Sequence, residues 1–126
     1  YFSAKFKLHE NLYNDLCKIN VELVFKQYYR EHNKIKANCD VEIAHRITYD
    51  IENKVVESII LASGDGDFVS LLDYAQSKLK GVRCFGVHPN NTSKMLKSRK
   101  YLRIIHMNQV IDNIQKREDL DTDFPV

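Results

Sequence analysis

The chain has 126 residues, of which 44% are hydrophobic and 29% charged, and its formal net charge is +2. This length and balance fit one soluble globular domain that needs no disulfide or metal to stabilise its core. No apolar run approaches the roughly 20 residues of a membrane span, and no signal peptide is visible. Three widely spaced cysteines without a C-x-x-C pair argue against a disulfide framework or a cysteine zinc site and for the cytoplasm.

The charges are segregated along the chain. Residues 40–73 hold eight acids and two bases, whereas residues 74–111 hold eight bases and no acid. An acidic segment beside a basic one suits a metal site next to a phosphate-binding surface. The alternative is two solvated faces on opposite sides of the fold.

The first part of the chain predicts two strands and a helix. Tyr1–Phe6 alternates apolar and polar residues as a strand does, and residues 8–19 have helical spacing, with Asn20 as the terminator. Val21–Phe25 is rich in β-forming residues and predicts the second strand. Residues 26–39 are polar and basic, and we interpret them as a strand end followed by a loop.

From Asp40 onward helices and strands alternate. Asp40 begins a helix and suits its N-cap, and the apolar stripe of that helix consists of Val41, Ala44, Ile47 and Ile51. Next come a buried strand over 56–62, a helix over 68–80 closed by Gly81 as a C′ glycine, and a strand over 82–87. A turn over 88–91 leads to a short basic helix capped by Thr92 or Ser93 and then to a strand over 102–107. The chain closes with a terminal helix capped by Asn108 and carrying Ile114, and with an acidic, disordered tail over 118–126. This order predicts an α/β domain with a mainly parallel sheet covered on both faces.

Two carboxylates, Asp65 and Asp67, lie in one glycine-containing turn between a buried strand and a helix. Ligands of open α/β sheets bind outside the carboxyl ends of the strands. Like charges this close are unfavourable unless a cation or a proton offsets them, and Mg²⁺ takes carboxylate oxygens while sharing phosphate oxygens of a substrate. Gly64 and Gly66 would allow a tight turn and close approach to a phosphate. The structural alternatives are an N-cap for Asp67 and an Asx turn for Asp65.

The hexapeptide Ser63–Phe68 resembles the S-G-D-x-D-F signature of the NYN domains, a branch of the PIN-like ribonuclease superfamily. Lys36 followed by Cys39–Ala44 resembles that family's lysine and D-V-x-L-A helix start, and Ser93–Leu96 resembles its Ser-x-x-Leu helix. The resemblance implies a PIN-like three-layer α/β/α sandwich over residues 1–117, with 118–126 as the tail.

The resemblance also implies an activity. Asp40, Asp65 and Asp67 would be the catalytic and metal-binding residues, holding Mg²⁺ or Mn²⁺ in an endoribonuclease whose metal-bound water cleaves RNA. Single-stranded or structured RNA is the expected partner, and we also consider a homodimer. The residues expected to contact nucleic acid are Lys26, Arg30, Lys34, Lys36, Ser63, Ser93, Lys94, Lys97, Arg99 and Lys100.

The sequence departs from the family pattern in three places. Tyr1–Phe6 resembles the family's second strand, so the first strand and helix, with a further acidic ligand, are expected to be missing from this sequence. Arg46 replaces an acid often found six residues after the helix-start Asp, and Ser98–Tyr101 replaces an acidic stretch. These changes favour the alternative function, a catalytically weak or inactive RNA-binding module on the same fold. A receiver-like domain would need a lysine facing the acids, and the sequence offers no clear one.

Overall fold

The computed structural model describes residues 1, 7–26, 29–31, 34–36 and 38–112. The chain divides into two units, Tyr1–Ile47 and Thr48–Val126. All but the first residue of the predicted strand Tyr1–Phe6, together with Ile114 and the tail over 118–126, lies outside the described residues.

The first helix of the first unit agrees with the prediction. It consists of a 3₁₀ turn, η1 (Lys7–His9), that continues into α1 (Glu10–Lys18). The Asn20 N–H donates to the Cys17 carbonyl at 3.1 Å and the Val21 N–H to the Leu16 carbonyl at 3.0 Å, while Asn20 has a φ of 61°. These two bonds and the left-handed residue form a Schellman motif, so the predicted terminator is confirmed.

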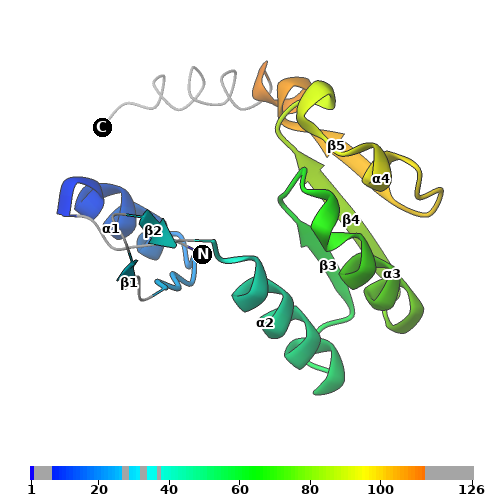
Figure 1. Ribbon diagram of the computed structural model, residues 1–126, viewed down its shortest axis with the longest axis horizontal. Coiled ribbons are helices and arrows are strands. Elements are labelled where there is room, and N and C mark those ends of the chain that lie inside the picture. Colours follow the sequence, from blue (N-terminus) through cyan, green and yellow to red (C-terminus); the bar gives the residue numbers. More distant parts are fainter. Residues whose placement is uncertain (2–6, 27–28, 32–33, 37, 113–126) are drawn as a thin grey trace, which may run out of the picture. The chain divides into compact units, whose positions relative to one another are not determined.

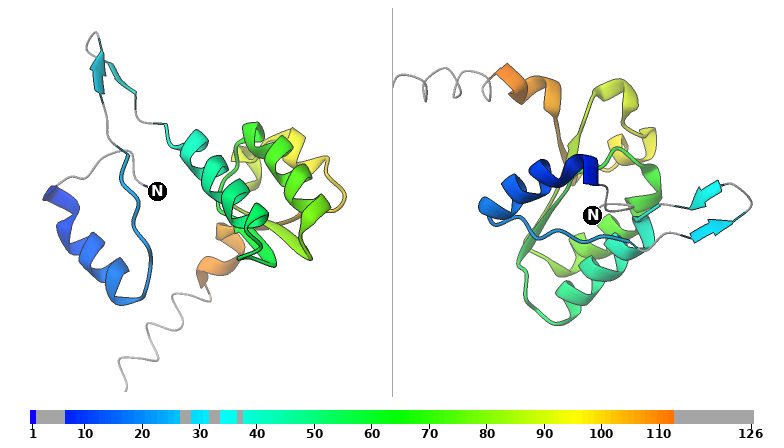
Figure 2. Two further views of the ribbon diagram at one scale, coloured as in Figure 1. Left: turned by 90° about the horizontal axis from the view of Figure 1, so that it is seen from below. Right: turned by 90° about the vertical axis from the view of Figure 1, so that its left-hand side faces the viewer.

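Two predictions for the next stretch are wrong. Val21–Phe25 forms no strand, because its pairing is limited to an isolated bridge at Phe25; β propensity produces a strand only where a partner ladder is available. The predicted loop over 26–39 contains a hairpin of β1 (Tyr29–Glu31) and β2 (Lys34–Lys36), two antiparallel strands with Tyr29 opposite Lys36. Figure 2 shows them as two adjacent cyan arrows.

The predicted helix at Asp40 is present as α2 (Asp40–Glu52), but Asp40 is its first residue and not its N-cap, because the Cys39 carbonyl accepts the Ile43 N–H at 2.9 Å. Of its predicted apolar stripe, Ile51 is buried and Ala44 and Ile47 are half-buried. Val41 is 77% exposed, so the stripe does not extend to the first turn of the helix. The α2 residues from Thr48 onward belong to the second unit.

A three-stranded parallel sheet forms the centre of the second unit (Figure 1). Its strands are β3 (Ser58–Leu61), β4 (Gly81–Gly86) and β5 (Arg103–His106), in that order across the sheet. Leu61 lies opposite Cys84, which lies opposite Ile104, so these side chains share one face. The predicted α/β class with a parallel sheet is confirmed.

Helix α3 (Val69–Lys78) covers that face of the sheet, as Figures 1 and 2 show. Leu72, Ala75 and Cys84 are fully buried, and a buried leucine contributes about 1.5–3 kcal/mol to folding. The opposite face carries Ile60, which is 66% exposed, and the exposed Arg83. Among the described residues, no helix is long and apolar enough to cross a membrane.

The predicted role of Gly81 is wrong. Helix α3 ends at Lys78, and the next residue, Leu79, is extended. Gly81 is the first residue of β4, and its φ is not positive. A 3₁₀ turn, η3 (Pro89–Asn91), precedes the short α4 (Lys94–Lys97). Ser93 caps α4, as predicted, because its Oγ accepts from the Met95 N–H at 3.2 Å. The last described helix covers residues 107–112, so Asn108 lies within it and does not cap it.

Candidate functional site

The acidic turn connects β3 to α3 through a 3₁₀ turn, η2 (Gly66–Phe68). The Asp65 carboxylate accepts the Asp67 N–H at 2.9 Å, and Ser63 Oγ accepts the Asp65 N–H at 3.1 Å. The Asx role therefore belongs to Asp65. The Asp67 carboxylate has no hydrogen bond or ion pair within the described part of the chain. Both carboxylates are exposed. The second oxygen of Asp65 and both oxygens of Asp67 are therefore available to a ligand.

The turn is fixed to the core at both ends. Phe68 and Val69 are each 4% exposed and fix the start of α3. On the other side, the Cys84 thiol donates to the Ser63 carbonyl at 2.9 Å. Burial raises the pKa of the Cys84 thiol, which keeps it protonated and able to donate. Cys84 is fully buried, so the carboxylates lie on a rigid support.

The two glycines allow a close approach within the protein. Neither Gly64 nor Gly66 has a positive φ. A Cβ on Gly64 would lie 2.7 Å from the Asn91 carbonyl oxygen, and a Cβ on Gly66 would lie 2.5 Å from Ser93 Oγ. The glycines thus let the acidic turn approach the chain between β4 and α4, and the Ser93 N–H donates to the Gly64 carbonyl at 2.9 Å.

A pocket of about 420 Å³ lies between these two segments. Its lining consists of Gly64, Asp65, Gly66, Asp67, Asn90, Asn91, Thr92, Ser93 and Met95. The turn supplies two carboxylates, and the opposite side supplies two carboxamides, two hydroxyls and a thioether. No lysine or arginine is among the lining residues.

The opposite wall of the pocket is held by its own hydrogen bonds. The Asn90 N–H donates to His88 Nδ1 at 3.1 Å, and the Asn91 N–H donates to the His88 carbonyl at 3.0 Å. Thr92 is 4% exposed, and its hydroxyl donates to the same carbonyl at 3.0 Å. The Lys97 ammonium donates to the Pro89 carbonyl. The backbone donors of this wall are therefore engaged within the protein.

Asp40, the third predicted ligand, is the first residue of α2 and belongs to the first unit. Asn38 holds it twice: its Nδ2 donates to the Asp40 carboxylate at 2.8 Å, and its Oδ1 accepts the Asp40 N–H at 2.7 Å. Lys26 donates to the Asn38 carbonyl at 2.6 Å and pairs with Glu42 at 2.8 Å. The hydrogen bond that Lys26 donates to the Glu42 carboxylate lowers the pKa of Glu42. Sequence reasoning missed Asn38, although an Asn is a recognisable signal for an Asx turn, in which its side chain bonds the backbone two residues on.

The predicted nucleic-acid contacts fall into three groups. Arg30, Lys34 and Lys36 lie on the β1–β2 hairpin. Lys26, Lys97 and Arg99 are engaged with protein groups, and the Ser63 and Ser93 hydroxyls accept backbone N–H groups. Lys94 and Lys100 are exposed, and the described residues provide no partner for either.

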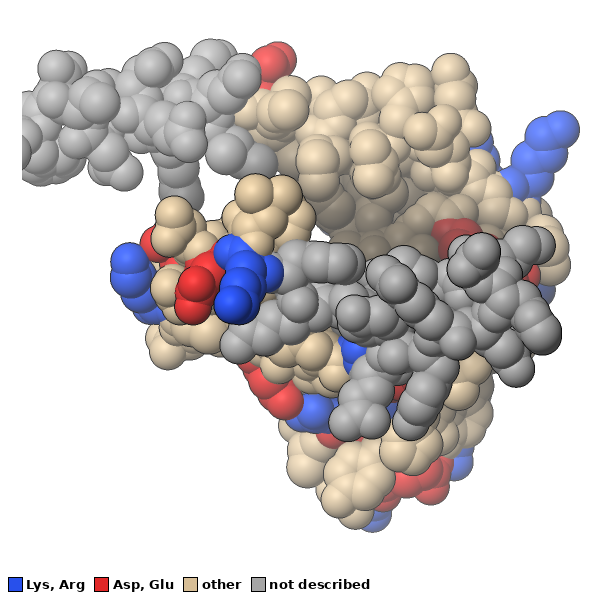
Figure 3. All heavy atoms as spheres, turned by 60° about the vertical axis from the view of Figure 1, so that its left-hand side comes forward, with Lys and Arg blue, Asp and Glu red and all other residues tan. Residues whose placement is uncertain are grey.

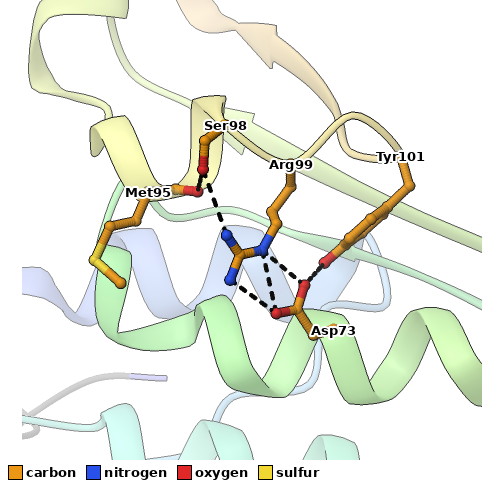
Figure 4. A network of polar contacts seen from close by, with 5 residues as sticks. All are labelled: Asp73, Met95, Ser98, Arg99 and Tyr101. Carbon is orange, nitrogen blue, oxygen red and sulfur yellow. Dashed lines mark hydrogen bonds and ion pairs between the residues drawn. The ribbon is translucent and has the colours of Figure 1, made fainter.

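Arg99 has the most extensive set of partners (Figure 4). Its Nε and Nη2 donate to the Asp73 carboxylate at 3.0–3.1 Å, and the Tyr101 hydroxyl donates to the same carboxylate at 2.6 Å. The Arg99 hydrogen bonds lower the pKa of Asp73, and Tyr101 adds to this shift. Burial, with the bond to Asp73, raises the pKa of Tyr101, so its hydroxyl remains a donor. This network joins α3 to the segment after α4.

The acidic and basic segments meet in the second unit. Lys78 pairs with Glu52 at 4.0 Å, and Lys80 pairs with Glu57 at 3.0 Å. On the face drawn in Figure 3, acidic and basic side chains are interspersed in small groups. In the first unit Arg46 pairs with Glu22 at 3.2 Å. Among the cations predicted to contact RNA, Lys26 and Arg99 are paired with acids of the same unit.

The parallel sheet with paired carboxylates after β3 defines a PIN-like α/β domain. The family model for the NYN domain matches residues 3–117, so the chain belongs to the NYN domain family. The resemblance stated from Ser63–Phe68 is thereby confirmed, and it places the chain in a nuclease-type superfamily.

The chain is similar to the solved structure of a protein of unknown function from Vibrio parahaemolyticus, with 25% sequence identity and a TM-score of 0.65. The match covers 83% of this chain and 65% of the Vibrio chain. None of the curated proteins matches this chain. The structural match agrees with the predicted PIN-like α/β/α fold.

Proposed function

We propose that this protein is a metal-dependent endoribonuclease in which Asp40, Asp65 and Asp67 hold one Mg²⁺ or Mn²⁺ ion. The observation that carries the proposal is the pair Asp65–Asp67, exposed and fixed at the carboxyl end of β3 in a member of the NYN family. Asp65 and Asp67 belong to the second unit, and Asp40 of the first unit is added as the third carboxylate because the family resemblance implies it.

The donor set suits a hard divalent cation. All three side chains offer carboxylate oxygens, which Mg²⁺ and Mn²⁺ prefer as ligands. The bond from Asp67 N–H orients the Asp65 carboxylate, and Asn38 orients the Asp40 carboxylate. When bound, such an ion activates water and stabilises the charge that develops on a phosphodiester.

The test is cleavage of a fluorescently labelled RNA by the purified chain with Mg²⁺ or Mn²⁺. We expect EDTA to abolish cleavage, added metal to restore it, and Asp65→Asn to lower the rate at least about a hundredfold, since orienting groups at metal sites alone contribute 10- to 100-fold. Asp15→Asn is the matched control, because Asp15 is an exposed aspartate of α1 whose partner is Lys18.

An uncut RNA with both metals would overturn the nuclease proposal. Binding without cleavage, unchanged by Asp65→Asn and weakened by removing Lys94 and Lys100, would support the RNA-binding module instead. Lys97 and Arg99 are poor choices for that test, because replacing either also removes a contact within the protein.

A further inference from the structure

The wall of the pocket opposite the acidic turn has no assigned role. It carries the carboxamides of Asn90 and Asn91 and the thioether of Met95. Both asparagines are exposed, and neither side chain has a hydrogen bond or ion pair within the described part of the chain. Met95 is 57% exposed. These three side chains are therefore available to a ligand.

The chemistry of this wall disfavours a phosphate. Its lining includes no cation, the nearby backbone N–H groups of residues 90–93 donate within the protein, and two carboxylates face it across the pocket. A phosphate could enter only beside a metal ion at the aspartates. The wall formed by Asn90, Asn91 and Met95 therefore suits a neutral part of a ligand that carries adjacent hydrogen-bond donors and acceptors.

A nucleobase is such a group. A carboxamide presents one donor and one acceptor side by side, and asparagine pairs in this way with a base edge. Unpaired bases in single-stranded RNA are recognised through such edges, with flat or polarizable side chains against their faces. The volume of about 420 Å³ lies in the range of small-ligand pockets, which is about 300–1,000 Å³.

We propose that Asn90, Asn91 and Met95 form a nucleobase subsite, which selects the base of the nucleotide whose phosphate lies at the aspartates. This inference rests on the proposed function for the identity of the substrate as RNA. Asn90 and Asn91 determine which base is accepted, and Met95 packs against the ring. The bonds from Asn90 N–H, Thr92 Oγ1 and Lys97 Nζ keep the wall in place without a ligand.

The experiment compares four short oligoribonucleotides, each of a single base type. Cleavage rates, and affinities by fluorescence anisotropy on ice before cleavage proceeds, are measured for the wild type with Mn²⁺. We expect at least about fivefold discrimination between the best and worst base, the low end for one bidentate contact. The double variant Asn90→Ala/Asn91→Ala should reduce the discrimination to less than about twofold in both assays.

Asn14→Ala is the control, since Asn14 is an exposed asparagine of α1. The unfolding midpoint of the double variant should lie within about 4 °C of the wild-type midpoint, because the two substitutions change exposed side chains. Intact discrimination in the double variant, or none in the wild type, overturns the subsite. Loss of discrimination in binding by a protein that cuts no RNA upholds the subsite and overturns the nuclease. Cleavage without any base preference upholds the nuclease and overturns the subsite.

Discussion

At the scale of single residues, Gly66 connects the acidic turn to the pocket wall. A Cβ at this position would lie 2.5 Å from Ser93 Oγ and 3.2 Å from Ser93 Cβ. The Ser93 hydroxyl cannot simply rotate away without losing its capping bond to the Met95 N–H. We expect Gly66→Ala to lower the free energy of unfolding by about 1–3 kcal/mol, as overpacking does.

Urea unfolding of Gly66→Ala and Gly81→Ala measures this effect. Gly81 is the control, because its added Cβ would meet Ser58 Cβ at an ordinary 3.4 Å and its φ is not positive. If both variants unfold at the same urea concentration, close approach is not the reason for glycine in the turn.

The residues of this turn show how far sequence reasoning reaches. The strand before the turn and the Asx bond of Asp65 are local or follow from hydrophobicity, and they could be predicted. The contact of Gly66 with Ser93 joins residues 27 positions apart, and no local pattern signals it. The same holds for the bond between Arg99 and Asp73, which lies 26 residues earlier in the chain.

At the scale of elements, the Asp73 network joins α3 to the segment after α4. The folded-state pKa of Asp73 is below its ordinary value, chiefly because of the Arg99 hydrogen bonds. The unfolded chain therefore binds a proton more readily than the folded one near this pKa. Stabilisation by the network is fully present above about pH 4, the unfolded pKa of an aspartate, and is lost as pH falls through the lower folded pKa.

We expect Asp73→Asn to destabilise the protein at pH 7 and to differ less from the wild type as the pH falls below 4. Unfolding midpoints measured between pH 2 and pH 7 test this expectation. Asp15→Asn, which removes an exposed ion pair with Lys18, serves as control and should have little effect. A difference for Asp73→Asn that persists unchanged at pH 2 would mean that the ionised carboxylate is not responsible.

Elements were predictable where they build the parallel sheet. The runs at β3, β4 and β5 are short and apolar, and turn signals separate them, so hydrophobic periodicity alone located them. The hairpin β1–β2 was not predictable in this way. Its strands have three residues each and are polar, and their pairing, with Arg30 opposite Ile35, carries no apolar alternation.

At the scale of the whole molecule, a shared metal ion would link the acidic turn to folding. A ligand that binds only the folded state adds stability by mass action, about 2.7 kcal/mol at a concentration 100 times its dissociation constant. For a domain of this size we expect the unfolding midpoint to rise on the order of 10 °C with Mn²⁺. EDTA should reverse the rise.

The variant Asp67→Asn tests whether the metal ion that raises the unfolding midpoint binds at the acidic turn. Without metal, removing one of two neighbouring carboxylates relieves repulsion but also removes a negative charge from the start of α3, so the two effects oppose each other and the midpoint should change little. With Mn²⁺ the variant should lack the rise that the wild type shows, while Asp15→Asn keeps it. Scanning calorimetry of the three proteins with and without Mn²⁺ tests this. An equal rise in Asp67→Asn would place the ion elsewhere, and the acidic turn would then have to be explained without a metal.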